Sequence, residues 1–332
     1  MRSASIFRSV ARARVGVAAA AVLSAVAAGI DLHSAQVGAP PAIFRSQTEL
    51  VVLQVAVTDA HRRYVPGLRA ENFTVLEQGQ PQPIVVFASA AAPLDVMLLI
   101  DTSGSMAPRL ADARQAALDL VGTLRSGDRA GVVLFNTIVQ FAQPLTDDLG
   151  AVADAIRGAA PTGATALYEA VYLALRAVSP APPAGGIRRR ALVVLSDGFD
   201  TRSRIPFEYT LDAANASDVT IFTIVPGPAL FEERTPGYRW RDGAARFELR
   251  RLAEATGGRA FVTRADSDLA DVYAQIGSEL REQYWVAYAS PVAGPGFRRV
   301  SVRVTDPPGL VARTRTGYDA GRNRISASGS PR

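Results

Sequence analysis

The sequence of 332 residues lacks two residue types on which common kinds of enzyme chemistry depend. It has no cysteine, which excludes disulfides, a thiol nucleophile and the attachment of a lipid to a thiol. It has no lysine either, since all 36 basic residues are arginine, and this excludes a Schiff base or the lysine of a phosphate-binding loop. We interpret the exclusive use of arginine as a bias of the genome rather than as a functional feature.

Histidine is also scarce, with only His33 and His61 in the chain. His33 lies in a segment that we expect to be removed, so a Ser–His–Asp hydrolase would need His61 to reach a serine from another region. An aspartyl phosphotransferase would need a second aspartate two residues after Asp101, where Ser103 stands instead. We therefore predict that the protein is not an enzyme, and metal-dependent hydrolysis is the least favoured alternative.

Charge is sparse and unevenly placed, with a net value of +5. Residues 1–35 contain four arginines and one aspartate, so the rest of the chain carries +2, which is too little to indicate nucleic-acid binding. The arginine-rich start precedes an uncharged run from Val15 to Ile30, a pattern typical of a secretory signal. The alternative is an uncleaved membrane anchor, although this run is short for a membrane span.

What the chain does have is organised around the stretch from Val96 to Met106, with the sequence VMLLIDTSGSM. Its five leading apolar residues do not alternate with polar ones, which is typical of a strand buried on both faces of a parallel sheet. Residues 110–124 then show the apolar spacing of a helix. We therefore expect Asp101, Ser103 and Ser105 on a strand-to-helix turn at the carboxyl edge of a sheet, where open α/β sheets bind ligands.

Two further stretches point to the same edge of the sheet. Thr165 stands at the start of a predicted helix, and the buried strand 191–195 is followed closely by Asp197. Taken separately, Thr165 is an ordinary helix cap and Asp197-Gly198 an ordinary turn. Together with the first stretch they would bring two carboxylates and three hydroxyls to one place. Ligands that are all oxygen suit a hard cation such as Mg²⁺.

Five positions resemble, in this order, the metal-ion-dependent adhesion site of von Willebrand factor A (VWA) domains: Asp101, Ser103, Ser105, Thr165 and Asp197. The resemblance covers residues 93–282, and the flanks are similar to those of bacterial secreted VWFA-related proteins. It implies that the three hydroxyls bind a divalent cation directly, while the two aspartates act mainly through water. The expected cofactor is Mg²⁺, with Mn²⁺ or Ca²⁺ as alternatives.

The predicted fold class is α/β, a doubly wound and mostly parallel sheet (VWA, Rossmann-like), because strands and helices alternate along the central part of the chain. The flanking N- and C-terminal strands are predicted to build a smaller β-sandwich, into which the VWA domain is inserted. The expected organisation is a signal peptide over 1–35, a linker over 36–46, an N-terminal β region over 47–90, the VWA domain over 93–282, C-terminal β-strands over 283–320 that pair with 47–90, and a disordered tail over 321–332.

Several segments leave more than one interpretation open. The insertion 227–246 takes part in recognition or packs on itself, and its aromatic residues are Phe231, Tyr238 and Trp240. Asp200 and Ser203 support the metal shell or serve in turns and helix caps. Apolar spacing predicts a helix over 248–255 and a short edge strand over 139–141.

We hypothesise that the protein is a secreted or envelope binding module of the adhesion type, located in the periplasm, on the cell surface or outside the cell. In this hypothesis the cation binds an Asp or Glu of a protein partner. The alternative is a structural component of an envelope complex whose metal only stabilises the fold. We expect no nucleic-acid partner, and contact with the membrane only through an uncleaved signal.

The first prediction concerns the N-terminus of the exported protein. The mature chain should begin between Ala28 and Gln36, because the small residues after the apolar run suit signal cleavage. The measurement is the intact mass of protein recovered from outside the cytoplasm. Recovery of the chain with Met1 in a membrane fraction would favour the anchor instead.

Overall fold

The computed structural model describes residues 49–89, 92–178, 188–226, 238–263, 268–292 and 294–320. The predicted signal peptide, linker and C-terminal tail lie outside these ranges, and so does the part of the insertion from 227 to 237. None of the helices within these ranges is long and apolar enough to cross a membrane.

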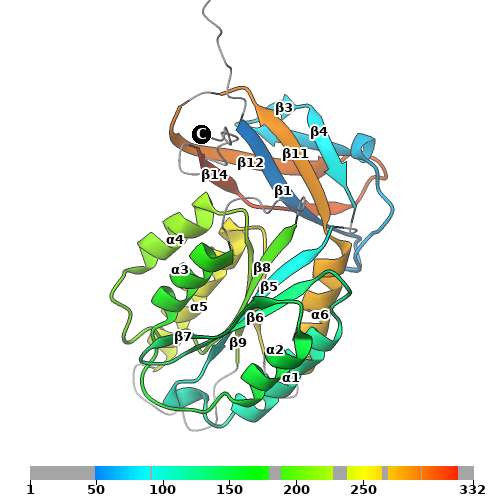
Figure 1. The fold of residues 1–332 in the computed structure, drawn as a ribbon. Coiled ribbons are helices and arrows are strands. Elements are labelled where there is room, and N and C mark those ends of the chain that lie inside the picture. The colour runs from blue at the N-terminus through cyan, green and yellow to red at the C-terminus, as the bar shows by residue number, and fades with distance from the viewer. Residues whose placement is uncertain are drawn as a thin grey trace, which may run out of the picture. The chain divides into compact units, whose positions relative to one another are not determined.

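Six of the described strands form a central sheet in the order β10-β9-β8-β5-β6-β7 (Figure 1). All neighbouring strands run parallel except the edge pair β6 and β7. The strands are β5 (Leu94–Asp101), β6 (Arg129–Phe135), β7 (Val139–Thr146), β8 (Arg189–Leu195), β9 (Thr220–Val225) and β10 (Ala260–Val262). Every residue of β5, β8 and β9 is buried, which explains why apolar residues follow one another there without alternation, as in 96–100 of β5 and 191–195 of β8.

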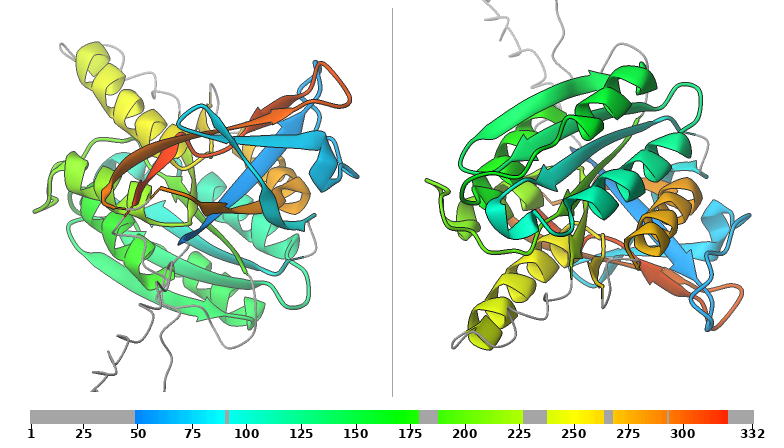
Figure 2. Two further views of the ribbon diagram at one scale, coloured as in Figure 1. Left: turned by 90° about the horizontal axis from the view of Figure 1, so that it is seen from above. Right: turned by 90° about the horizontal axis from the view of Figure 1, so that it is seen from below.

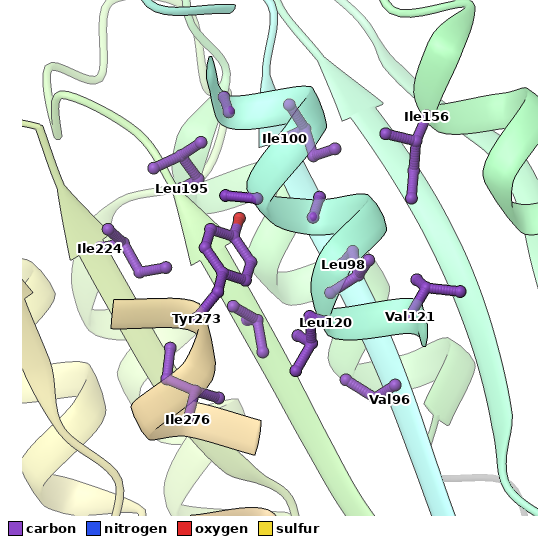
Figure 3. Packing of buried hydrophobic residues seen from close by; sticks show 14 of the residues in the cluster. Val96, Leu98, Ile100, Leu120, Val121, Ile156, Leu195, Ile224, Tyr273 and Ile276 are labelled. Carbon is purple, nitrogen blue, oxygen red and sulfur yellow. The ribbon is translucent and has the colours of Figure 1, made fainter. Parts of the chain in front are cut away.

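Helices cover both faces of this sheet (Figure 1 and Figure 2). One face packs against α1 (Leu110–Gly122), α2 (Leu149–Arg157) and α6 (Asp268–Glu282), and the other packs against α3 (Leu167–Val178), α4 (Phe207–Ala216) and α5 (Tyr238–Ala255). Successive residues of β5 enter the two cores alternately. Leu98 and Ile100 pack with Tyr273 of α6 (Figure 3), whereas Met97 and Leu99 pack on the opposite face. Both cores therefore hold β5 in place.

The two flanks of the chain together form a sandwich of two antiparallel four-stranded sheets, β13-β1-β11-β4 and β14-β12-β2-β3. The strands are β1 (Glu49–Thr58), β2 (Phe73–Glu77), β3 (Gln80–Gln82), β4 (Ile84–Ala88), β11 (Tyr284–Ser290), β12 (Gly296–Val304), β13 (Val311–Arg313) and β14 (Gly317–Ala320). A short 3₁₀ turn, η1 (Ala70–Asn72), precedes β2 of the sandwich, and a second, η2 (Gly104–Met106), follows β5 of the central sheet. Alternating side chains of β1, β2, β11 and β12 fill the space between the sheets.

Hydrogen bonds, most of them partly buried, join the sandwich to the end of the central sheet where its parallel strands begin. Gln54 Nε2 donates to the carbonyl oxygens of Arg190 and Asp218, at the starts of β8 and β9. The Tyr64 hydroxyl donates to Glu279 Oε2 of α6 at 2.6 Å, and the buried Arg315 guanidinium donates to carbonyls at the end of α4. The carboxyl edge of the parallel strands therefore faces away from the sandwich.

The predicted fold class is confirmed, but two elements differ from their predictions and a third element is not predicted. Helix α5 begins at Tyr238 rather than at 248, because its first half is polar and contains Gly243, which weakens the periodic signal. Strand β7 continues to Thr146, since an edge strand tolerates both polar residues and Pro144. Helix α4 is the element without a prediction, because its Thr, Asp and Asn residues favour helices only weakly.

Candidate functional site

The carboxylate of Asp101 lies fully buried at the last position of β5. Its Oδ2 accepts a hydrogen bond from the Ser196 hydroxyl at 2.6 Å, and its Oδ1 accepts one from the backbone N–H of Ser103 at 2.8 Å. Burial, and then repulsion from the nearby Asp197 carboxylate, raise the pKa of Asp101 to about 7. The charged form is therefore costly here unless a positive charge lies beside it.

The hydroxyls of Ser103 and Ser105 lie next to this carboxylate, on the loop that leaves β5. Their Oγ atoms are 3.1 Å apart, and Ser103 is buried whereas Ser105 is exposed. Adjacent oxygen ligands of an octahedral Mg²⁺ with bonds near 2.1 Å lie about 3.0 Å apart. The two hydroxyls therefore fit neighbouring positions around a small hard cation.

Thr165 lies on the loop before α3, which is hydrogen-bonded directly to the serine loop. The backbone N–H of Gly104, between the two serines, donates to the Gly163 carbonyl at 3.0 Å. The N–H of Thr162 donates to the Thr102 carbonyl at 2.7 Å. Two such bonds fix the Thr165 loop against the turn that follows β5, so that the structure brings both segments to the same edge.

Asp197 follows β8, the strand adjacent to β5, and it is buried with 6% of its surface exposed. Its Oδ1 accepts a hydrogen bond from the backbone N–H of Phe199 at 3.2 Å. The backbone N–H groups of Thr201 and Arg202 both donate to the Thr165 carbonyl at 2.9 Å. The loops that carry Asp101, Thr165 and Asp197 are thus joined by hydrogen bonds into one network, the loop assembly.

Three residues that hold this assembly together are missing from the sequence prediction. Ser196 donates to Asp101, and the Thr201 hydroxyl accepts from the N–H of Thr165 at 3.0 Å. Asn136 donates to the Thr102 hydroxyl at 3.1 Å, and its carbonyl accepts from the N–H of Ala166 at 2.7 Å. Only Ser196 carried a signal, as the polar residue beside Asp197 at the end of an apolar run.

Asp200 and Ser203 act as caps and turn residues in this structure. Asp200 Oδ2 accepts from the N–H of Tyr168, and Ser203 Oγ accepts from the N–H of Glu169, both at 3.0 Å. These N–H groups belong to the first turn of α3, which has no partners for them within the helix. The loop after Asp197 therefore fixes the position at which α3 begins, directly after Thr165.

Gly163 has a backbone conformation and a position that only glycine accommodates. Its φ is +72°, and a Cβ added there would lie 2.3 Å from Thr137 Oγ1. The same hydroxyl accepts a hydrogen bond from the N–H of Ala164 at 2.9 Å. This close approach joins the turn between β6 and β7 to the Thr165 loop.

The donor set at this edge suits a hard cation, with two carboxylates, three hydroxyls and no nitrogen or sulfur. In the part of the chain described, no group of three or more histidine or carboxylate side chains lies close enough to hold a metal. A cation bound here would therefore depend on neutral hydroxyls for much of its protein coordination. It would also offset the repulsion between Asp101 and Asp197.

His61 lies in the connection between β1 and β2, on the sandwich side of the central sheet. Its backbone N–H donates to Asp59 Oδ1, and Tyr64, three residues further along the chain, donates to Glu279 of α6. Ser103 and Ser105 stand at the other end of β5, a strand of eight residues or roughly 25 Å. In this structure His61 therefore cannot act as a base for either serine.

Comparison with known proteins shows similarity to a domain family and to a relative. Residues 96–199, which include all five predicted site residues, match the von Willebrand factor type A domain. A UPF0353 protein of Mycolicibacterium paratuberculosis is 29% identical over 215 residues, which cover 60% of this chain and 63% of that protein. The match therefore spans less than two thirds of the length of this relative.

Two solved structures are similar in part. A von Willebrand factor type A structure from Catenulispora acidiphila matches with 16% identity and a TM-score of 0.48, over 83% of this chain and 75% of that one. Proximal thread matrix protein 1 from the mussel byssus, with a zinc occupied MIDAS motif, matches with 18% identity and a TM-score of 0.46, over 58% of this chain and 49% of that one.

A substitution at Gly163 tests whether this close approach holds the site together. Gly163→Ala should lower the free energy of unfolding by about 1–2 kcal/mol or more, because alanine disfavours a positive φ and its Cβ meets Thr137. Chemical denaturation measures the change. Gly122→Ala is the matched control, since Gly122 ends α1 with open space around it and should be neutral or stabilising. Equal stabilities of both variants would contradict this role of Gly163.

Proposed function

The chain carries a von Willebrand factor type A domain, and on this premise we propose that it is a metal-dependent protein-binding module of the adhesion type. The observation that carries the proposal is the pair of serine hydroxyls 3.1 Å apart beside the fully buried Asp101. Domains of this family often hold a divalent cation at such a site. The proposed ligand set is Asp101, Ser103, Ser105, Thr165 and Asp197.

Each residue of the proposed set has a separate task. Ser103, Ser105 and Thr165 present neutral oxygens, so they neutralise none of the charge of the ion. Asp101 and Asp197, both buried, supply the negative charge that makes the edge attractive to a cation. A divalent cation held in this way supplies an electrophilic centre that a carboxylate of another protein can complete. We propose Mg²⁺ as this cation, because the spacing of the serine hydroxyls fits its small shell.

The proposed partner is a protein that presents an aspartate or glutamate. Outside residues 1–35 the chain carries a net charge of only +2, which favours a local contact with one acidic group over long-range attraction to a polyanion. We propose that binding takes place outside the cytoplasm, because the N-terminal residues have the pattern of a secretory signal.

Magnesium should stabilise the folded protein by binding at this edge. At a magnesium concentration one hundred times the dissociation constant, the free energy of unfolding rises by about 2.7 kcal/mol. This raises the melting temperature by several degrees relative to the protein in chelator. The Asp101→Asn variant should lose this response. At about pH 8, where a carboxyl with a pKa of about 7 is mostly charged, the variant should melt no lower than the parent in chelator, because it no longer buries a charge.

The control for the magnesium response is Asp154→Asn, which removes an exposed carboxylate of α2 that is not part of the proposed ligand set. This variant should keep the full shift in melting temperature. If the parent shows no shift with magnesium or manganese, or if Asp101→Asn retains one, the proposed metal site is wrong.

Partner capture should depend on the same residues. Crosslinking from the native envelope should recover a partner in magnesium and lose it in chelator. Thr165→Ala removes one oxygen and should weaken capture, whereas Asp101→Ala removes charge and should weaken it more. Replacement of the acidic residue of the partner should cost several kcal/mol, as does the loss of one member of a desolvated charge pair.

The capture experiment needs a variant that disturbs the surface but not the site. Arg299→Gln serves, because Arg299 is exposed on β12 of the sandwich. Capture that survives chelator and both site substitutions would contradict the metal-dependent mechanism, even with the fold intact.

A further inference from the structure

Three exposed residues lie on the two loops that are hydrogen-bonded to residues 164–165. Ile138 is 65% exposed in the turn between β6 and β7. Arg202 and Arg204 are exposed on the loop after Asp197. Neither arginine forms an ion pair or a side-chain hydrogen bond within the described part of the chain, although Asp112 and Glu208 begin helices at the same edge.

Ile138 lies on one side of the site, and Arg202 and Arg204 lie on the other. The sheet order β8-β5-β6 places the serine loop in the middle, the turn with Ile138 on one side and the loop with Arg202 on the other. The turn is fixed by the bond from Ala164 N–H to Thr137 Oγ1, and the arginine loop by the bond from Arg202 N–H to the Thr165 carbonyl. Both positions are therefore held by backbone hydrogen bonds at residues 164–165.

The distance across this arrangement suits an extended peptide. Neighbouring strands lie about 4.8 Å apart, so the loops after β6 and β8 are separated by about 10 Å. Side chains of an extended chain alternate between its two faces, so residues on the same face recur about every 7 Å. A peptide whose acidic residue lies over the serine loop would thus bring the residues two positions before and after it, whose side chains point the same way, toward Ile138 and Arg202.

We propose that Arg202 and Arg204 select a second carboxylate in the bound segment, and that Ile138 contacts an apolar residue on the other side of the first. The proposal rests on the proposed function, because the first carboxylate is the one that the metal site binds. An arginine without a carboxylate partner can form charge-assisted, bidentate hydrogen bonds with an incoming acid. An exposed isoleucine in a turn, where polar residues are usual, offers apolar surface to a partner.

The proposal makes the order of residues in the partner specific. The preferred segment is extended and holds an apolar residue, then the acid that binds at the metal site, then a second acid, all within about six residues. The same order read in the opposite chain direction is equally compatible, because the arrangement fixes sides and not polarity. An apolar residue and a second acid on the same side of the first acid would not fit.

A displayed library of random linear dodecapeptides tests this with the full chain. The chain is panned in magnesium, bound peptides are eluted with chelator, and the recovered sequences are compared with the unselected library. We expect enrichment of peptides that contain two acids and an apolar residue. The second acid and the apolar residue should lie on opposite sides of the acid that binds at the metal site. The Arg202→Gln/Arg204→Gln variant should lower the enrichment of two-acid over one-acid peptides about tenfold, as expected for the loss of hydrogen bonds to a charged group.

Matched variants separate this surface from a general effect of charge or hydrophobicity. Arg299→Gln, on the sandwich, removes one exposed arginine without changing the rim of the site. Val311→Ser removes an apolar side chain that is 62% exposed on β13, for comparison with Ile138→Ser. Ile138→Ser should remove the apolar preference but keep both acids, whereas neither sandwich variant should change the recovered sequences.

The outcomes distinguish this proposal from the proposed function. Magnesium-dependent recovery of peptides with one acid and no second preference would overturn the role of Arg202 and Arg204 and leave the metal site standing. The same result follows if the double variant recovers the same sequences as the parent. If the parent recovers no peptides in a magnesium-dependent manner, the proposed function fails and this proposal fails with it.

Discussion

The geometry of the carboxyl edge depends on one buried negative charge, the carboxylate of Asp101. Placing this group at the end of a fully buried strand removes it from water, and the neighbouring Asp197 adds repulsion. The Ser196 hydroxyl and the Ser103 N–H offset part of this cost, and their bonds fix where β8 ends and where the serine loop turns. The network of loops around Asp101 follows from the need to satisfy this carboxylate.

The loop network also explains how residues that are far apart in the sequence form one site. Residues near positions 102, 136, 163 and 201 contact one another only because parallel strands end at a common edge. Each loop is held by backbone groups of its neighbours, so no single loop fixes the site alone. Gly163 is the point at which this packing tolerates no side chain, since the turn after β6 approaches it too closely.

Much of the fold could be predicted from the sequence, because the runs 96–100 in β5 and 191–195 in β8 are apolar without interruption and polar residues follow them. This pattern predicts both the parallel sheet and the edge to which Asp101 and Asp197 belong. Helix α4 and the first half of α5 gave no comparable signal, since their residues are polar or weakly helical and their order comes from packing. Asn136 and Thr201 could not be assigned either, because their roles are hydrogen bonds to residues distant in sequence.

The way in which the sandwich closes has a mechanical consequence. The described chain begins at Glu49, which pairs with Ser290 at one end of the β1–β11 ladder, and the α/β domain joins β11 at Tyr284, at the other end. The second connection leaves β4 beside the same end, since Ala88 pairs with Trp285. A pull between Glu49 and the carboxyl edge of the central sheet would therefore draw β1 and β11 in opposite directions along their length. In this shear geometry the hydrogen bonds of the ladder carry the load together rather than one after another, so the strand pair that closes the sandwich is oriented to resist tension.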